Sequence, residues 1–250
     1  MEYDGIKTII GRILSEVSWA GSKVKTYRKG GAGFENVLSA EVFQILDFLP
    51  RKQFLHKILE NIKMISGYNF SISEDEAEEM NLDILPGNFY LKKNFKAHRD
   101  GMSVQPDGFI ESNKTLIMLE AKRIKSSSFQ QKQLAKEFYL LTREAKKKRP
   151  FLLLITSSDP PFLVKGIGKK SPEKDILDEM ESVFLKANNH SLSLLGIKDL
   201  VMNSVGWITW FDILEICQNQ LENIGTKDSS YKNSIKRMVY ELQKVIERHS

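Results

Sequence analysis

Two carboxylates and one lysine stand out in the middle of the 250-residue chain, because their types and spacing could support phosphate chemistry. Pro106-Asp107 is followed, thirteen residues after the aspartate, by Glu120-Ala121-Lys122. Residues i and i+2 of a β-strand point to the same face, so Glu120 and Lys122 are expected to project together. If the preceding strand pairs with this one as a hairpin, Asp107 reaches the same place. The spacing therefore predicts that all three side chains converge at the edge of a sheet.

Such a trio suits the hydrolysis of a phosphodiester bond. Two carboxylates with water form a hard, oxygen-rich site for Mg²⁺, which keeps most of its waters and bridges to a phosphate. The metal polarises the phosphate and acidifies a bound water. A neighbouring lysine can position or deprotonate that water and neutralise the charge that develops on the phosphate. The expected cofactor is Mg²⁺, for which Mn²⁺ can substitute, with Asp107 and Glu120 as its ligands.

The elements that must position these residues indicate an α/β fold with a mixed sheet. Residues 103–111 and 115–123 have the pattern of two strands joined by a tight hairpin connection. A long polar helix is predicted over 128–148, and the apolar run 151–156 is typical of a strand buried on both faces. Further predicted elements are helices over 2–19, 34–48, 51–65, 172–188, 212–223 and 231–248, a strand over 205–211 and a loop over 157–171.

The motif and its surroundings resemble the PD-(D/E)XK nuclease superfamily. The residues that carry the resemblance are Pro106, Asp107, Glu120 and Lys122. The acid-x-lysine pair ends an apolar strand, and a helix and then a buried strand follow it, as in the core of that family. The resemblance covers roughly residues 25–160 and implies a restriction-endonuclease-like mixed β-sheet core flanked by helices. The whole chain, 1–250, is then expected to be a single nuclease domain, with additional C-terminal helices over about 161–250.

The resemblance also implies further site residues. The family adds an acidic residue from its first core helix as a metal ligand or water orienter. Glu35, in Gly33-Phe34-Glu35-Asn36, lies at the start of the predicted helix 34–48, where an acid would also complement the helix dipole. Glu41, on an otherwise apolar face of the same helix, is the alternative. Gln133, on the helix after the acid-x-lysine strand, is a candidate for orienting the site. The implied catalytic residues are Asp107, Glu120, Lys122, Glu35 or Glu41, and Gln133.

The basic charge of the chain is concentrated beside this motif. Residues 121–149 hold ten basic and two acidic residues, a local charge of +8 in a chain whose net charge is +5. Such asymmetry suggests an anionic partner, nucleic acid first, although a solvated helix face is the alternative. The candidates for contacts with a DNA backbone are Lys29, Lys125, Lys132, Lys136, Lys169 and Lys170.

The composition excludes several other classes of protein. A hydrophobic content of 41% and a charged content of 28% exclude disordered and low-complexity chains. The one cysteine, Cys217, excludes an intramolecular disulfide and a Cys-x-x-Cys site. No apolar run approaches the roughly 20 residues that span a bilayer, and the start of the chain lacks a signal-peptide pattern. We therefore expect a cytoplasmic protein with no membrane partner.

These expectations combine into one functional hypothesis and two alternatives. The resemblance implies a Mg²⁺-dependent endodeoxyribonuclease that leaves 5′-phosphate and 3′-hydroxyl ends, in a restriction or other bacterial defence system. Double-stranded DNA is the expected partner, and a homodimer is expected where two strands need two sites. The first alternative is a catalytically silent or partner-dependent nucleic-acid-binding or assembly module of the same fold. The second is an RNA nuclease of that fold.

Overall fold

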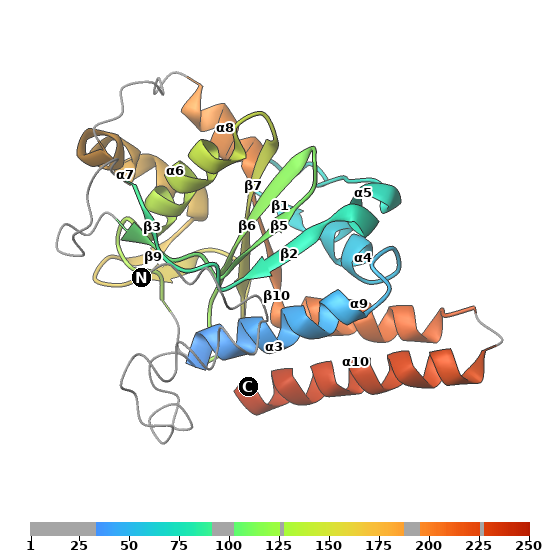
Figure 1. Cartoon of the computed structure of the whole chain (residues 1–250). Coiled ribbons are helices and arrows are strands. Elements are labelled where there is room, and N and C mark those ends of the chain that lie inside the picture. Colours follow the sequence, from blue (N-terminus) through green and yellow to red (C-terminus); the bar gives the residue numbers. More distant parts are fainter. Residues whose placement is uncertain (1–33, 92–102, 126–127, 188–195, 226–227) are drawn as a thin grey trace.

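A six-stranded mixed sheet forms the centre of the protein in a computed structural model, which describes residues 34–91, 103–125, 128–187, 196–225 and 228–250. Its strand order is β1-β10-β7-β6-β5-β2 (Figure 1). Strands β6, β7 and β10 run parallel, and the other pairings are antiparallel. The strands are β1 (Lys63–Met64), β2 (Asn81–Ile84), β5 (Gly108–Glu111), β6 (Thr115–Ala121), β7 (Arg149–Thr156) and β10 (Val205–Thr209).

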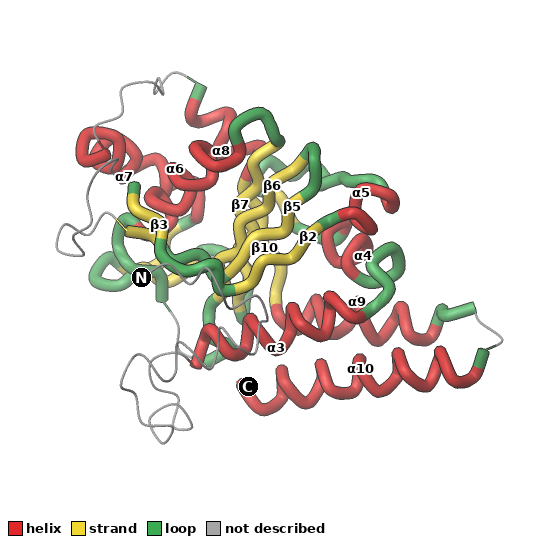
Figure 2. The backbone as a smooth tube through the Cα atoms, viewed as in Figure 1, coloured by secondary structure: helices red, strands yellow, loops and turns green. Residues whose placement is uncertain are grey.

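Helices cover both faces of this sheet (Figures 1 and 2). On one face lie α6 (Gln133–Ala145), α7 (Pro172–Ala187) and α8 (Ile197–Ser204). On the other face lie α3 (Phe34–Phe48), α4 (Leu55–Glu60), α5 (Glu74–Glu79), α9 (Trp210–Glu222) and α10 (Ser229–His249). Two small antiparallel sheets complete the described fold: β3 (Phe89–Tyr90) pairs with β4 (Ser103–Val104), and β8 (Phe162–Val164) with β9 (Gly168–Lys170).

The apolar strand β7 explains how the sheet holds two cores. Successive side chains of a strand point to opposite faces. Leu153 and Ile155 therefore join the core on the side of α3 and α9, whereas Leu152 and Leu154 join the core under α6 and α7. The prediction that this run is a strand buried on both faces is confirmed.

The same alternation sets the direction of the side chains along β6. Ile117 and Leu119 lie in the core beside α3, and Met118 lies in the core beneath α6. Glu120, two residues after Met118, falls on the side of α6 and is buried. The strand thus places a carboxylate at its carboxyl end, facing a helix rather than solvent.

The predicted α/β class and most predicted elements are confirmed. The predicted strand over 103–111 is wrong as a single element, because β4 and β5 belong to different sheets, and the predicted strand over 205–211 ends at Thr209, where α9 begins. Helix α3 has the predicted bounds. The predicted helix over 51–65 is wrong at its end, because α4 stops at Glu60 and β1 follows. The predicted helix over 128–148 begins late, at Gln133, since Phe129 instead forms a bridge with Val164. The predicted loop over 157–171 contains β8 and β9, and the predicted helix over 2–19 lies outside the described residues.

The C-terminal segment contributes a strand to the central sheet in addition to its helices. Strand β10 lies between β1 and β7, with Trp207 opposite Lys63 on one side and opposite Leu154 on the other. Helix α9 begins directly after β10, and α10 then packs along α3 and α9. In the described part of the chain, none of the helices has the length and apolarity to cross a membrane.

Candidate active site

A polar pocket of about 130 Å³ opens beside the carboxyl end of β6. It is formed by α3, by the segments that follow β2 and precede β5, by the end of β6 and by the start of α6. Its lining residues are Asn36, Leu85, Gln105, Pro106, Asp107, Glu120, Lys122 and Gln133. The structure therefore brings Asp107, Glu120 and Lys122 together, as their spacing predicts, and it places Gln133 beside them.

Asp107 is fastened to both neighbouring strands by its backbone and by its side chain. Its N–H donates to the carbonyl oxygen of Leu119 at 3.2 Å, and its own carbonyl accepts from the N–H of Leu85 at 2.9 Å. Its Oδ2 accepts a hydrogen bond from the N–H of Ala121 at 2.7 Å. The side chain is 8% exposed. These bonds hold the carboxylate against the end of the strand that carries Glu120.

Leu85, on the pocket wall, has an unusual backbone conformation. Its φ of +54° lies in the left-handed region, which a leucine seldom adopts. Leu85 is buried, and its N–H is bound by Asp107, so the surrounding structure holds this conformation in place. Strain of this kind is often found at functional sites, where the fold enforces it.

Glu120 is the centre of a buried polar cluster. Its Oε1 accepts hydrogen bonds from Lys122 Nζ and from Gln133 Nε2, each at 2.5 Å. Glu120 and Lys122 are 3% and 7% exposed. Lys122 Nζ also lies 4.9 Å from the centroid of the Phe129 ring. Because charged hydrogen bonds are strong when shielded from water, this cluster fixes the positions of all three polar groups.

The backbone of Lys122 is held from two sides. Its N–H donates to the carbonyl oxygen of Ile155 at 2.7 Å, which continues the pairing of β6 with β7. Its carbonyl oxygen accepts a hydrogen bond from the indole N–H of Trp210 at 2.7 Å. Trp210 is fully buried, so this residue belongs to the core, as its sequence context indicates.

Glu137 is a member of this cluster that the sequence analysis missed. It is 2% exposed, interacts with Glu120 and Gln133, and has no hydrogen-bond partner at Oε2 among the described residues. Burial raises the pKa of Glu137 well above its ordinary value, and the charge of Glu120 raises it further, while Lys122 opposes the rise. The available signal was its position four residues after Gln133, which places both side chains on one face of a helix.

The two candidate acids of the first helix have different surroundings. Glu41 faces α10, where its carboxylate pairs with Arg248 and lies 3.7 Å from His249 Nε2, and it does not line the pocket. Glu35 is the second residue of α3, and its side chain lies outside the described part of the structure. Asn36, next to Glu35 in the chain, lines the pocket. The start of α3, and not its middle, therefore borders the site.

The predicted DNA-binding lysines differ in their exposure and in their ion pairs. Lys132 Nζ donates to Ser182 Oγ at 2.8 Å and lies 3.4 Å from Glu179, and Lys170 pairs with Asp175 and Asp178 of the same helix at 3.4 and 3.1 Å. Both lysines therefore interact with α7 instead of facing solvent freely.

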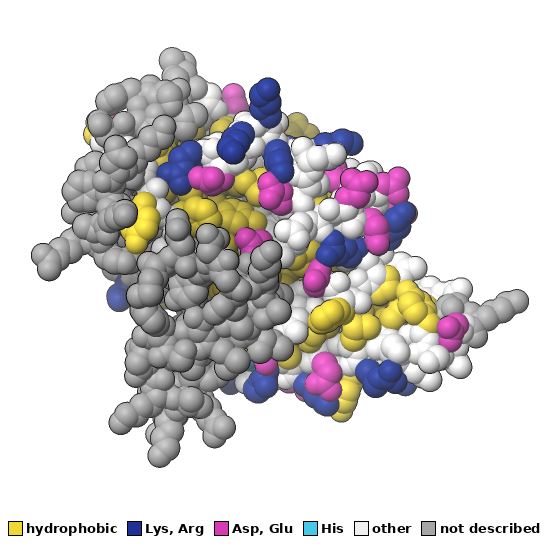
Figure 3. All heavy atoms as spheres, viewed as in Figure 1, with side chains coloured by type: hydrophobic (Ala, Val, Ile, Leu, Met, Phe, Trp, Pro, Cys, Tyr) yellow, Lys and Arg dark blue, Asp and Glu magenta, His cyan; other side chains and the backbone are white. Residues whose placement is uncertain are grey.

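Lys136 is half-buried, and burial lowers its pKa, whereas Glu137 opposes the change. Lys125 and Lys169 are exposed, and Lys29 lies outside the described residues. On the face shown in Figure 3, several basic side chains lie in the upper part of the view, with acidic side chains among and beside them. Only part of the basic segment is thus available to a polyanion.

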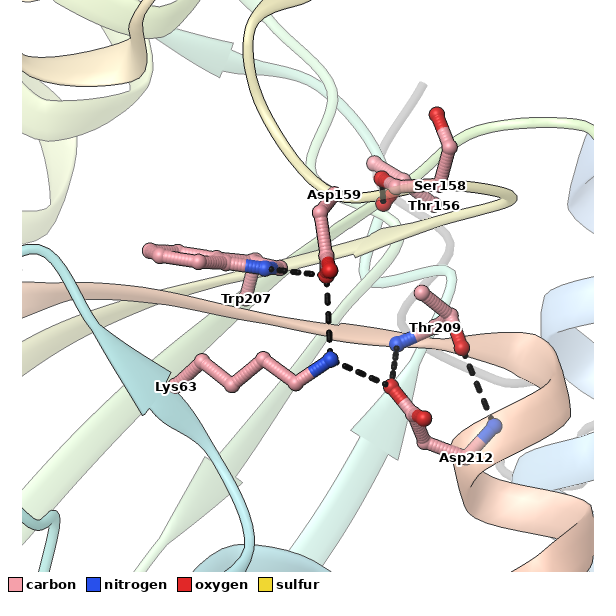
Figure 4. A network of polar contacts seen from close by, with 7 residues as sticks. All are labelled: Lys63, Thr156, Ser158, Asp159, Trp207, Thr209 and Asp212. Carbon is pink, nitrogen blue, oxygen red and sulfur yellow. Dashed lines mark hydrogen bonds and ion pairs between the residues drawn. The ribbon is translucent and has the colours of Figure 1, made fainter.

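A second polar network supports the helix that carries Trp210 (Figure 4). Lys63 Nζ bridges Asp159 and Asp212 at 3.0 and 3.3 Å, and the Trp207 indole donates to Asp159 at 2.9 Å. Asp212 and Thr209 exchange backbone and side-chain hydrogen bonds in a capping box at the start of α9. The network is largely exposed. We assign it a structural role, because it ties β1 and the segment after β7 to the first turn of α9.

Comparisons with known proteins do not add an identity. No family model, curated protein or solved structure matches the chain. Within the described residues, no group of three or more His, Cys, Asp and Glu side chains converges as a metal site. The assignment of a function therefore depends on the geometry of the pocket.

Proposed function

We propose that the protein is a Mg²⁺-dependent endonuclease of the PD-(D/E)XK type that hydrolyses phosphodiester bonds in double-stranded DNA. The observation that carries this proposal is the convergence of Asp107, Glu120 and Lys122 in one polar pocket at the end of β6. Two carboxylates, one at the end of β6 and one just before β5, together with water and substrate phosphate, are the kind of ligand set that Mg²⁺ accepts. A restriction or other bacterial defence enzyme, acting as a homodimer on the two strands, is the setting that suits this activity.

Each residue of the pocket has a role in this scheme. Asp107 and Glu120 would hold Mg²⁺, which when bound polarises the scissile phosphate and acidifies water. Lys122, buried beside them, neutralises negative charge that develops on the phosphate. Gln133 fixes the carboxylate of Glu120 by its hydrogen bond of 2.5 Å. Asp107 is fixed by the N–H of Ala121.

The surroundings of the pocket supply the contacts to the DNA backbone. The exposed Lys125 follows the pocket lysine closely in the chain, and Lys169 lies on β9. Contacts of lysines with phosphates release counterions, so binding weakens as salt concentration rises. Glu35 remains the proposed acid of the first helix, because the adjacent Asn36 borders the pocket.

The test is to measure cleavage and binding separately in conservative variants of the pocket. We expect Asp107→Asn, Glu120→Gln and Lys122→Met to lower plasmid cleavage in Mg²⁺ or Mn²⁺ on the order of 10²-fold or more. Binding to a short duplex, measured in Ca²⁺ without cleavage, should change far less. Mapping the ends of the products then shows whether both strands are cut and with what stagger.

Glu111→Gln and Lys114→Met are matched controls, because both residues are exposed at the opposite end of the same hairpin. Their cleavage should equal that of the unaltered protein. Cleavage that survives Asp107→Asn or Lys122→Met would show that the active site lies elsewhere. Duplex binding without any cleavage by the pure protein would instead favour a binding module of this fold, and cleavage confined to RNA would change the substrate class.

A further inference from the structure

The β8–β9 hairpin has one buried face and one exposed face. Phe162 and Val164 point inward and are buried. Leu163 is 51% exposed and lies opposite Lys169 on the outer face, since the two residues are paired across the strands. The turn between the strands adds Lys165, which is exposed, and Ile167, which is 47% exposed. We refer to these exposed side chains of the strands and the turn together as the outer face, which combines two lysines with two aliphatic side chains.

This hairpin is joined directly to the candidate active site. The N–H of Phe129 donates to the carbonyl oxygen of Leu163 at 2.9 Å, and the N–H of Lys165 donates to the carbonyl oxygen of Phe129 at 2.9 Å. The ring of Phe129 in turn lies 4.9 Å from Lys122 Nζ. Phe129 thus contacts both the hairpin and the pocket lysine, which places the hairpin next to the segment that follows β6.

Among the described residues, no acidic side chain pairs with the lysines of the outer face. Lys165 and Lys169 form no ion pair with the described residues, in contrast to Lys170 on the inner face, which pairs with two aspartates of α7. A pair of unneutralised lysines attracts a polyanion. A phosphate, however, would not stabilise the exposed aliphatic side chains of Leu163 and Ile167. We therefore expect the face to bind a polyanion that also presents apolar groups.

We propose that the outer face of the β8–β9 hairpin binds in the major groove of a DNA duplex held at the pocket. The inference deepens the proposed nuclease function and rests on it for the choice of partner. The major groove admits a two-stranded β-ribbon and displays the methyl groups of thymine. Lys165 and Lys169 contact phosphates at the edges of the groove, and Leu163 and Ile167 contact its methyl groups. Duplex DNA offers both surfaces together.

The lysines are tested by the salt dependence of binding. The full-length protein is titrated with a short duplex in Ca²⁺ at several salt concentrations. Since each phosphate contact contributes about 0.9 to the slope of log K against log salt, K165A/K169A should lower the slope by roughly 2. The matched control is K232A/K236A, which removes two exposed lysines of α10, on the other side of the molecule from β9 (Figure 1). The control should leave the slope unchanged.

The aliphatic side chains are tested by removing the methyl groups from the DNA. Duplexes that contain uracil in place of thymine should bind the unaltered protein roughly fourfold more weakly for each methyl group that the hairpin would otherwise touch. L163A/I167A should bind both duplexes equally. Leu185→Ala, a change at an exposed leucine of α7, should retain the preference for thymine. Thermal unfolding of each variant shows that these exposed substitutions leave the fold intact.

The outcomes separate this inference from the proposed function. If K165A/K169A leaves the slope unchanged, or if the unaltered protein does not distinguish thymine from uracil, the groove contact is wrong, although the pocket can still cleave DNA. If the hairpin variants behave as expected but Asp107→Asn cleaves normally, the hairpin inference stands and the active-site assignment fails. Binding to single strands or to anionic vesicles, with no affinity for the duplex, would overturn the groove contact.

Discussion

The indole N–H of Trp210 donates a hydrogen bond of 2.7 Å to the carbonyl oxygen of Lys122, which joins the first residue of α9 to the lysine of the pocket. We predict that Trp210→Phe preserves most of the packing but removes this hydrogen bond to the carbonyl oxygen of Lys122. A lost hydrogen bond of this kind costs about 1 kcal/mol. If that free energy serves to position Lys122 in the transition state, the cleavage rate should fall by up to roughly fivefold. The rate constant and the affinity for duplex DNA are measured separately, and the affinity should remain unchanged.

Trp207→Phe is the matched control for this prediction. Its indole N–H also makes a hydrogen bond, at 2.9 Å to Asp159, but that bond is exposed and lies on the supporting network. Its loss should leave the cleavage rate within a factor of two. Equal effects of the two variants would mean that both tryptophans act only through the general stability of the fold.

We predict that the buried Glu137 makes the folded protein less stable as pH rises. Burial, and after it the charge of Glu120, raises the pKa of Glu137 well above 4.5 in the folded protein. Folding therefore favours the protonated acid, and this contribution is full below pH 4.5 and is lost as pH rises through the folded pKa. Glu137→Gln mimics the protonated acid and should remove this loss, so its melting temperature should exceed that of the unaltered protein progressively above pH 4.5.

Glu144→Gln provides the comparison on the same helix, since Glu144 is partly exposed and pairs with Arg143. Any change in melting temperature that the two variants share therefore does not come from the buried cluster around Glu137. If Glu137→Gln follows the same pH profile as the unaltered protein, folding does not raise the pKa of Glu137 and our description of the cluster is wrong.

We predict that Glu41 has the opposite effect and makes the folded protein less stable as pH falls. Burial pushes its pKa up, but His249 and Arg248 outweigh this effect and hold the pKa below 4.5. The contribution of Glu41 to stability is thus present above pH 4.5 and is lost as pH falls through the folded pKa. Glu41→Gln should lower the free energy of unfolding by about 0.5 kcal/mol at pH 7 and by less at pH 3. Denaturant titrations at the two pH values measure the difference.

The same variant tests whether Glu41 has a place in catalysis. Because its carboxylate faces α10, cleavage by Glu41→Gln should match that of the unaltered protein. A loss of cleavage comparable to that of Asp107→Asn, in a variant that remains folded, would restore Glu41 as the acid of the first helix.

The close packing around Gly206 on β10 predicts that any side chain larger than hydrogen destabilises the fold. A Cβ atom there would lie 2.7 Å from Ile62 Cγ2 and 2.9 Å from both Lys63 O and Phe151 Cζ. Gly206→Ala should therefore separate β1 from β10 and destabilise the fold by about 1–3 kcal/mol. Gly225→Ala is the control, because its Cβ would meet nothing within 4 Å. Thermal unfolding of the two variants measures the effect, and equal melting temperatures would contradict it.

Elements whose structure depends mainly on their own residues could be predicted from the sequence. The run Phe151–Ile155 predicts β7 because a short apolar segment buried on both faces is typical of a central strand. The spacing of Asp107, Glu120 and Lys122 predicted their convergence because strand alternation and a short hairpin leave little freedom. The trio lines one pocket, as expected.

Other features depend on partners far away in the chain. Strand β1 has two residues and pairs with Gly206 and Trp207, so its own residues give no strand pattern. Glu137 resembles a solvated acid in a polar helix, and its burial follows only from the face of α6 that the sheet covers. In the sequence, nothing distinguishes Lys132 and Lys170 from solvent-exposed lysines. In the fold, both pair with carboxylates of α7.

The placement of the trio on one hairpin has a consequence for how the protein folds. Asp107 and Ala121 are 14 positions apart in the chain, whereas the Lys63–Asp212 contact spans 149 positions. Closing the longer loop costs about 2 kcal/mol more chain entropy, since this cost grows with the logarithm of loop length. Contacts between near neighbours in sequence also form fastest. The two proposed metal ligands and their lysine can thus reach their mutual arrangement before the C-terminal strand completes the sheet.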